Sequence, residues 1–144
     1  EWPTYQVDQM IFDPNYVPRA FTVSYHRLVY EYVLSYPLTR IDGLTEYFKD
    51  KTGETIKQPS LLNRVGIAFE EEGQYDTAIA LFKLNIELFP SDGNLWDSLG
   101  EGYLANGDKT QAIASYQKAL AIAPSEECYW CANAKEKLAT LSIK

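Results

Sequence analysis

The apolar side chains of this chain recur at steps of three and four residues, the spacing that places them on one face of an α-helix. The first such stretch covers residues 22–36, and Pro37 closes it because proline cannot continue a helix. Its apolar positions are Val23, Tyr25, Leu28, Val29, Tyr32, Val33 and Tyr36. The pattern predicts an amphipathic helix here.

A second stretch with the same spacing covers residues 39–51. Thr39 followed by Asp42 approximates a capping box, which marks the start of a helix. Gly53 is a suitable stop. Farther on, Pro59 suits the first turn of another helix.

Residues 1–21 show no clear period and are interrupted by three prolines. Trp2, Tyr5 and Phe12 give this segment apolar bulk, and a segment this apolar is expected to be covered. We therefore interpret it as an extended arm. These three residues are predicted to form an interface with a missing upstream domain or a second copy of the chain.

The strongest pattern is a self-match at a spacing of 34 residues. It pairs Gly66, Gly73, Ala78, Ile79, Ala80, Pro90 and Ser91 with Gly100, Gly107, Ala112, Ile113, Ala114, Pro124 and Ser125. A period of this length, with small and large residues at fixed offsets, predicts stacked helix-turn-helix units. The prediction is an all-α fold of about seven helices. The five that follow the first two are expected over residues 59–72, 76–89, 94–106, 110–123 and 126–141.

The repeated positions resemble the tetratricopeptide repeat (TPR) family, whose pattern sets large, small and aromatic residues around a turn glycine and closes with proline. The first repeat, 59–92, supplies Leu62, Gly66, Phe69, Gly73, Ala78, Phe82 and Pro90. The second, 93–126, supplies Trp96, Gly100, Tyr103, Gly107, Ala112, Tyr116, Ala119 and Pro124. Asn85 departs from the pattern, because the family usually has a small residue there.

The resemblance implies a right-handed superhelical array of antiparallel helix pairs. It divides the chain into the arm (1–21), an N-terminal helix pair (22–58), two repeats (59–92 and 93–126) and a C-terminal capping helix (127–144). Such arrays hold peptides or proteins and seldom carry chemistry. The resemblance therefore implies a non-catalytic protein-interaction or scaffold module.

In this family the first helix of each pair lines the partner groove. The positions expected there are Asn63, Arg64, Ile67, Glu71, Asn94, Asp97, Glu101 and Leu104. Chaperone-binding members grip a terminal carboxylate with Lys and Asn, and this clamp is not matched, since only Arg64 is basic. On electrostatic grounds a basic peptide suits the acidic groove better. The alternative is that the surface is simply solvated or covered by the flanking helices.

A second hypothesis comes from a resemblance of residues 61–108 to the TPR tails of some bacterial serine hydrolases. These include esterases of the α/β-hydrolase type and penicillin-binding-protein-like hydrolases. The resemblance rests on three segments, LLNRVG, FKLNIELFP and WDSLGEGYL. The resemblance implies an accessory C-terminal domain of a larger enzyme whose nucleophile lies outside this chain, which fits a sequence that opens at Glu1 without Met.

The charge and composition of the chain exclude some classes of binding partner. The net charge of −7 argues against nucleic acid, because phosphate binding needs clustered Lys and Arg. No stretch approaches the ~20 continuous apolar residues of a membrane span, and no signal peptide is visible. The expected partner is a protein or peptide, and the sequence leaves the compartment open between cytoplasm and periplasm.

No catalytic, cofactor or metal site is expected. The chain has neither a Gly-x-Ser-x-Gly elbow nor a phosphate-binding glycine-rich loop. His26 is its single histidine and is predicted to be structural or exposed. Cys128 and Cys131 form a Cys-x-x-Cys pair, but their helical surroundings favour two small apolar residues on the first turn of a helix over a redox site.

Overall fold

The computed structural model describes residues 24–125 and 128–142. Trp2, Tyr5 and Phe12, the predicted arm interface, lie outside them. The described chain forms α2 (Tyr25–Ser35), η2 (Leu38–Gly43), α3 (Leu44–Thr52), α4 (Pro59–Glu71), α5 (Tyr75–Leu88), α6 (Gly93–Ala105), α7 (Lys109–Ala121) and α8 (Cys131–Ser142). Apart from the 3₁₀ helix η2, these are seven α-helices, with no strand in the described ranges. The prediction of an all-α fold with about seven helices is confirmed.

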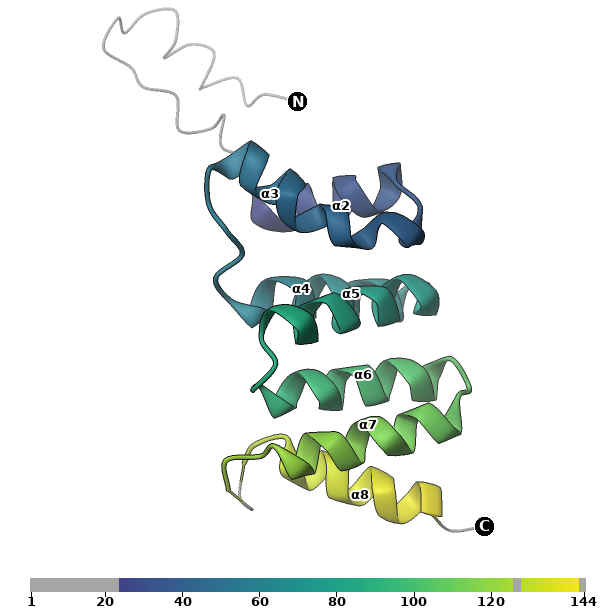
Figure 1. Ribbon diagram of the computed structural model, residues 1–144. Helices are drawn as coiled ribbons and strands as arrows, with labels where there is room; N and C mark the ends of the chain where they lie inside the picture. Colours follow the sequence, from purple (N-terminus) through teal and green to yellow (C-terminus); the bar gives the residue numbers. More distant parts are fainter. Residues whose placement is uncertain (1–23, 126–127, 143–144) are drawn as a thin grey trace, which may run out of the picture.

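The helices stack in sequence order from α2 and α3 at one end to α8 at the other (Figure 1). The most extensive contacts lie within the pairs α4–α5 and α6–α7, while α5 with α6 and α7 with α8 join neighbouring units. Each unit thus contacts mainly its neighbours in the chain, which is the arrangement of a repeat array.

In both helix pairs, α4–α5 and α6–α7, a glycine on the first helix packs against an aromatic ring on the second. On α4, Gly66 faces the ring of Phe82 on α5; on α6, Gly100 faces the ring of Tyr116 on α7. A Cβ atom added at Gly100 would lie 2.7 Å from Cε1 of Tyr116. The ring therefore fills the space that a side chain would need, and the helices approach closely.

Glycine also makes the turn inside each pair. Gly73 follows α4 with φ of 80°, and Gly107 follows α6 with φ of 82°. Both lie in the left-handed region that glycine adopts without steric cost. The turn positions predicted from the repeat are therefore confirmed.

The N-terminal pair differs from the prediction at the start of its second helix. In place of a capping box at Thr39, the backbone forms η2, with non-helical angles at Arg40, and α3 begins only at Leu44. The hydroxyl of Tyr32 on α2 donates a hydrogen bond to the carbonyl oxygen of Arg40. A helical segment thus begins near Thr39, as predicted, but its first part, Leu38–Gly43, is a 3₁₀ helix and not an α-helix.

Asn85, the departure from the repeat pattern, is fully buried on α5. Its Nδ2 donates to the carbonyl oxygen of Pro59 at 2.8 Å and so ties α5 to the first turn of α4. In the first repeat a hydrogen bond therefore joins the two helices at this position, whereas the second repeat has the small residue Ala119 there.

Candidate functional site

The predicted groove residues lie on the first helices of the two pairs. Those on α4 are Asn63, Arg64, Ile67 and Glu71, and those on α6 are Asn94, Asp97, Glu101 and Leu104. Their exposure differs sharply: the side chain of Ile67 is 39% exposed, whereas that of Asp97 is 9% exposed. The set therefore splits into an open part and a covered part.

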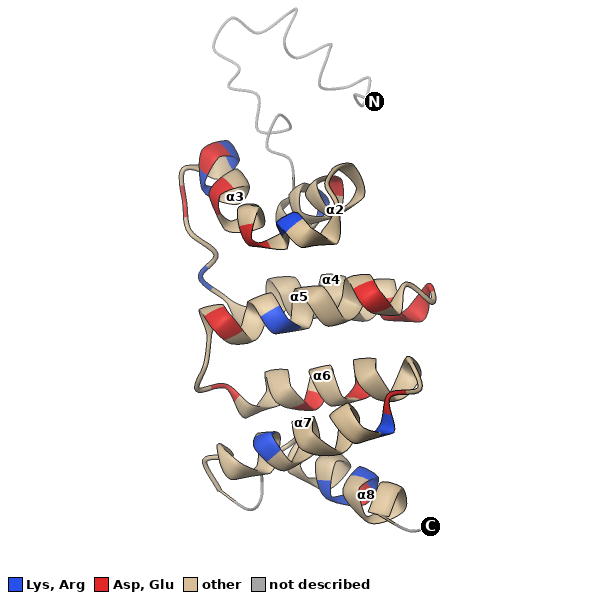
Figure 2. Cartoon of the chain, turned by 45° about the vertical axis from the view of Figure 1, so that its right-hand side comes forward, with Lys and Arg blue, Asp and Glu red and all other residues tan. Residues whose placement is uncertain are grey.

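The covered part is a polar network that joins α6 to α7 and α8. Asn133 on α8 donates from Nδ2 to Oδ1 of Asp97 and to Oε2 of Glu101, both at 3.0 Å. The hydroxyl of Tyr116 on α7 donates to the same Oε2 at 2.5 Å. Lys137 lies 3.8 Å from the other oxygen of Glu101. We call these five residues the α6–α8 network; Figure 2 shows that α6 carries acidic positions and α8 carries basic ones.

The environment of the network shifts the titration of its acids. Burial raises the pKa of Asp97 to about 6, and the nearby charge of Glu101 adds to this, while the hydrogen bond from Asn133 and the charge of Lys137 oppose it. Burial also raises the pKa of Glu70 on α4, with a further contribution from Glu101. Asp97 is buried and Glu101 is half-buried, and both use their oxygens to bind Asn133 of α8.

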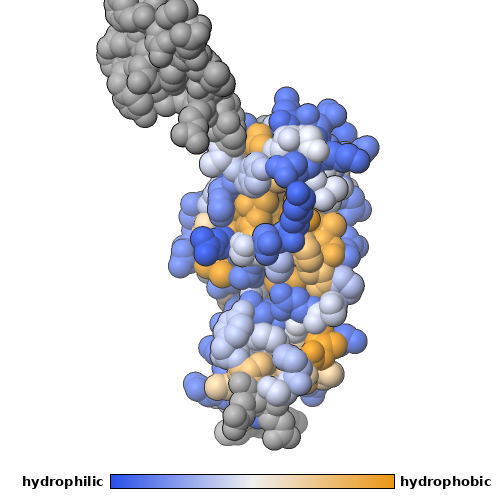
Figure 3. Space-filling view, turned by 90° about the vertical axis from the view of Figure 1, so that its left-hand side faces the viewer, coloured by the Kyte–Doolittle hydropathy of each residue, from blue (hydrophilic) through white to orange (hydrophobic). Residues whose placement is uncertain are grey.

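The open part centres on a small pocket where α4 and α6 begin. It is about 190 Å³ in volume. Its lining residues are Pro59, Ser60, Asn63, Arg64, Asp92, Asn94, Leu95 and Tyr129. We call it the Tyr129 pocket. Three groove residues predicted from the sequence, Asn63, Arg64 and Asn94, thus come together around one cavity. Figure 3 views the molecule from this end, where apolar side chains reach the surface among hydrophilic ones.

Tyr129 is the most exposed of the pocket residues that the sequence did not predict, which also include Pro59, Asp92 and Leu95. It is 81% exposed, although a tyrosine of a small domain normally buries much of its ring. The signal available in the sequence was its position inside the Cys-x-x-Cys segment between two predicted helices.

The two cysteines are joined as a disulfide that closes the loop carrying Tyr129. The Cα atoms of Cys128 and Cys131 are 5.1 Å apart, within the range that a disulfide requires. The expected position on the first turn of a helix is right for Cys131 and wrong for Cys128, which precedes α8, and the redox state that the sequence left open is a disulfide. The last helix also begins at Cys131, later than predicted, because the disulfide loop occupies the residues before it.

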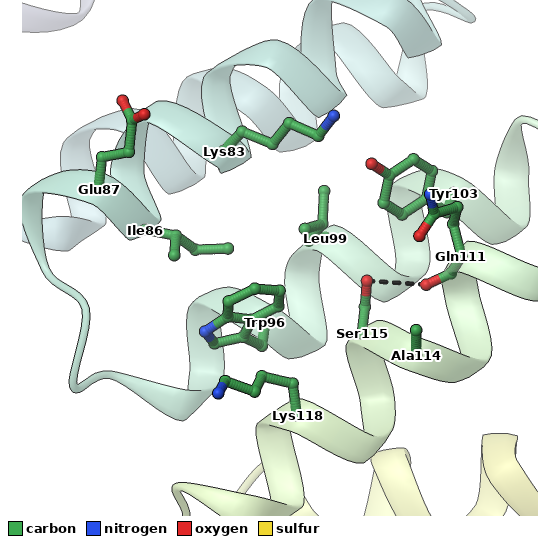
Figure 4. Close-up of a pocket in the computed structure, with 10 residues that line it drawn as sticks. All are labelled: Lys83, Ile86, Glu87, Trp96, Leu99, Tyr103, Gln111, Ala114, Ser115 and Lys118. Carbon is green, nitrogen blue, oxygen red and sulfur yellow. Dashed lines mark hydrogen bonds between the residues drawn. The ribbon is translucent and has the colours of Figure 1, made fainter.

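A larger pocket opens between α5, α6 and α7 (Figure 4). Its volume is about 560 Å³, and it shares no residue with the Tyr129 pocket. The residues that line it are Lys83, Ile86, Glu87, Trp96, Leu99, Tyr103, Gln111, Ala114, Ser115 and Lys118. We call it the Trp96 pocket.

No group of three or more His, Cys, Asp or Glu in ranges 24–125 and 128–142 is placed to hold a metal ion. Of the helices described, none combines the length and apolarity needed to cross a lipid bilayer.

Comparison with known proteins agrees with this geometry. Residues 93–126, which contain α6 and α7, match the family model described as tetratricopeptide repeat. The fold is that of a TPR array. A solved structure with the same architecture is PcrH from Pseudomonas aeruginosa, with a TM-score of 0.57 and 16% sequence identity. The match covers 88% of this chain and 99% of PcrH, and at this identity it shows the fold alone.

Curated relatives match over parts of the TPR region. Superkiller complex protein 3 of Homo sapiens is 38% identical over 61 residues, which is 42% of this chain and 4% of that protein. Tetratricopeptide repeat protein 37 of Xenopus laevis is 32% identical over 79 residues, 54% of this chain and 5% of that protein. The chain thus spans 4–5% of the length of these relatives. Together, the repeat and its relatives support a protein-interaction module, because TPR arrays generally bind proteins or peptides and are not catalytic.

Proposed function

We propose that the chain is a non-catalytic interaction module that holds an extended segment of a partner protein at the Tyr129 pocket and along the open face of α4. The observation that carries the proposal is the exposed Tyr129 ring beside Asn63, Arg64 and Asn94. The division into arm, N-terminal pair, two repeats and capping helix is part of this proposal.

The chemistry of the pocket suits a peptide backbone. Side-chain amides such as those of Asn63 and Asn94 can both donate and accept hydrogen bonds, and Oδ1 of Asn63 is buried without a partner among the described residues. A tyrosine adds an apolar ring with a polar tip, a combination enriched at protein interfaces.

The rest of the open face continues along α4 toward its C-terminal end. Ile67 offers an exposed apolar contact, and Glu71 is exposed at the last turn. A basic side chain of the partner would complement Glu71. Asp97 and Glu101 contribute indirectly by keeping α8 and its preceding loop in place.

The test is affinity capture from native extract with quantitative mass spectrometry. Arg64→Glu and Tyr129→Ala change exposed side chains, so the fold is expected to persist, which circular dichroism checks. Partners enriched by the unchanged protein should be lost with both variants and kept with Glu136→Ala, an exposed substitution on α8. Equal capture by all four proteins would remove the Tyr129 pocket as the binding site.

The second candidate is the accessory domain of a larger bacterial serine hydrolase, which rests on the sequence resemblance of residues 61–108. Its test is the mass of the native protein, detected with an antibody against residues 59–144. A much larger species containing a hydrolase domain is the expected result. A species near 16.4 kDa would rule this candidate out.

A further inference from the structure

We infer that the Trp96 pocket is a second docking surface, which takes an apolar side chain flanked by carboxylates from a partner polypeptide. It lies apart from the Tyr129 pocket, and its occupant differs in charge from the basic side chain proposed beside Glu71.

The floor of the pocket is apolar. Leu99 and Tyr103 are buried at its base, and Trp96 and Ile86 are half-buried beside them. Figure 4 shows these side chains converging from α5 and α6. The volume of about 560 Å³ falls within the roughly 300–1,000 Å³ typical of ligand sites. A cavity of this kind favours large apolar side chains, because it removes their surface from water.

The α7 wall carries the polar side chains of Gln111, Ser115 and Lys118, and of these the Ser115 hydroxyl already has a partner within its own helix. The hydroxyl of Ser115 donates to the main-chain oxygen of Gln111 at 2.9 Å (Figure 4). Ala114, one residue earlier, is small and exposed. The wall is therefore open enough for a side chain to enter beside it.

Two lysines mark the rim on opposite helices. Lys83 on α5 lies over the ring of Tyr103, with Nζ 5.6 Å from its centroid, and Lys118 on α7 lies over the ring of Trp96 at 5.9 Å. The ion pairs found in the described part of the chain, Arg27–Glu31, Lys57–Glu54 and Lys137–Glu101, involve neither lysine. In Figure 4 the Glu87 carboxylate points away from the cavity, while Lys83 extends across it.

The charge at the rim of the pocket favours a partner segment with acidic side chains. Two ammonium groups and one carboxylate, that of Glu87, line the cavity, so its lining carries a net positive charge on a chain with a net charge of −7 and attracts carboxylates. Because the apolar floor separates the lysines, the fitting sequence places one or two apolar residues between acidic ones. Two lysines are too few for nucleic acid, whose binding needs a basic patch or stripe.

The probe is a fluorescein-labelled peptide, Glu-Glu-Leu-Phe-Glu-Glu, whose binding to the full chain is followed by fluorescence anisotropy. We expect the double variant Lys83→Glu/Lys118→Glu to weaken binding at least tenfold. Ala114→Met, which adds neutral bulk at the wall, should weaken it as well. The matched control is Lys49→Glu/Lys109→Glu, which changes the charge equally at exposed lysines away from the pocket and should leave binding unchanged.

Peptide controls separate the two parts of the inference. Lysine in place of the glutamates should abolish binding by removing charge complementarity, and serine in place of Leu-Phe should abolish it by removing the apolar anchor. Tyr129→Ala should leave peptide binding intact, so failure of the Tyr129 pocket and failure of the Trp96 pocket are distinguishable.

Three binding results would each overturn the inference. They are no binding to the unchanged protein at millimolar peptide, equal binding to the Lys83→Glu/Lys118→Glu variant, and equal binding of the lysine and glutamate peptides. A dimer in sedimentation that the same double variant dissociates would also overturn it, because the occupant would then be a second copy of this chain.

Discussion

Glu101 is the side chain through which α6 contacts two other helices. It accepts hydrogen bonds from Tyr116 on α7 and Asn133 on α8, and it faces Lys137. Its neighbour one turn earlier, Asp97, has the same donor, Asn133, but is nearly fully buried. Replacing either acid by lysine would therefore break contacts that position α8, and would test folding rather than binding.

Asp97 is expected to make the stability of the protein depend on pH. Its pKa is raised from 3.8 to about 6 in the folded state, so the folded protein holds a proton that the unfolded chain releases. The free energy of unfolding should then fall as pH rises from about 4 to 6, by up to about 3 kcal/mol relative to Asp97→Asn. Urea unfolding of both proteins at pH 4 and pH 7 measures the difference. Asp76→Asn, at an exposed position on α5, is the control, and parallel pH profiles for the unchanged protein and Asp97→Asn would contradict the assignment.

Gly100 is expected to reject even a methyl group. Gly to Ala inside a helix normally stabilises by roughly 0.5–1 kcal/mol, but here the new Cβ would meet the Tyr116 ring at 2.7 Å. That ring is fully buried and its hydroxyl is bound to Glu101, so it cannot easily move away. Overpacking costs about 1–3 kcal/mol, and we expect Gly100→Ala to destabilise the protein by about 1–2 kcal/mol in urea unfolding. Ser98→Ala on the same helix is the control, and a more stable Gly100→Ala would show that the ring yields.

At the scale of elements, α8 depends on two attachments. Its first residue, Cys131, is buried and joined to Cys128, and two residues later Asn133 enters the α6–α8 network. The disulfide closes the loop that leads into α8, while the network and the packing of Ala134 against α7 hold the helix on the repeats.

Reduction of the disulfide is expected to loosen α8 and leave the helix pairs intact. For so short a loop, the chain-entropy treatment gives a stabilisation of about 2 kcal/mol. Hydrogen exchange followed by mass spectrometry should show faster exchange in Cys131–Ser142 after reduction, with α4 to α7 little changed. The Cys128→Ser variant should behave as the reduced protein does, with or without reductant. Uniform exchange throughout the chain would mean that α8 and the repeats open as one unit.

In the molecule as a whole, each helix pair is stabilised mainly by its neighbours in the chain. One end can therefore open without unfolding the other. The N-terminal pair meets the repeats mainly through α2 on α4, together with η2 on α5, and these contacts are less extensive than those of α5 with α6 or α7 with α8. In an array, a weak interface lets an end unit open before the rest.

Val29→Ala tests this property, because Val29 is fully buried on α2. Removing its methyl groups should cost about 1–3 kcal/mol, and exchange should accelerate over Tyr25–Thr52 while α6 to α8 stay protected. Leu34→Ala, at a position 74% exposed, is the control and should change little. Equal acceleration in all helices would contradict local opening.

Features that depend on residues close together in the sequence were mostly predicted correctly, and features that depend on distant residues mostly were not. The helices, the turn glycines Gly73 and Gly107, and the contacts of Gly66 and Gly100 depend on residues within one repeat, so periodicity revealed them. The 3₁₀ geometry at the start of the second helix was not predicted, and there the carbonyl oxygen of Arg40 accepts a hydrogen bond from Tyr32 on another helix. Of the predicted groove, Asn63, Arg64 and Asn94 do share a pocket, while Tyr129 escaped notice because its position depends on the disulfide loop.

By itself, the sequence determined that the chain is an all-α repeat array, since a 34-residue period encodes local helix pairs that must stack to bury their apolar faces. Which parts of its surface are open to solvent and which are covered by other helices became clear from the three-dimensional arrangement alone. It assigned Asp97 and Glu101 to α8, brought Lys83 and Lys118 to the rim of one cavity, and bonded Cys128 to Cys131. Apart from the cysteine pair, these arrangements join side chains from different helices, whose separation in the sequence carries no signal of their contact in space.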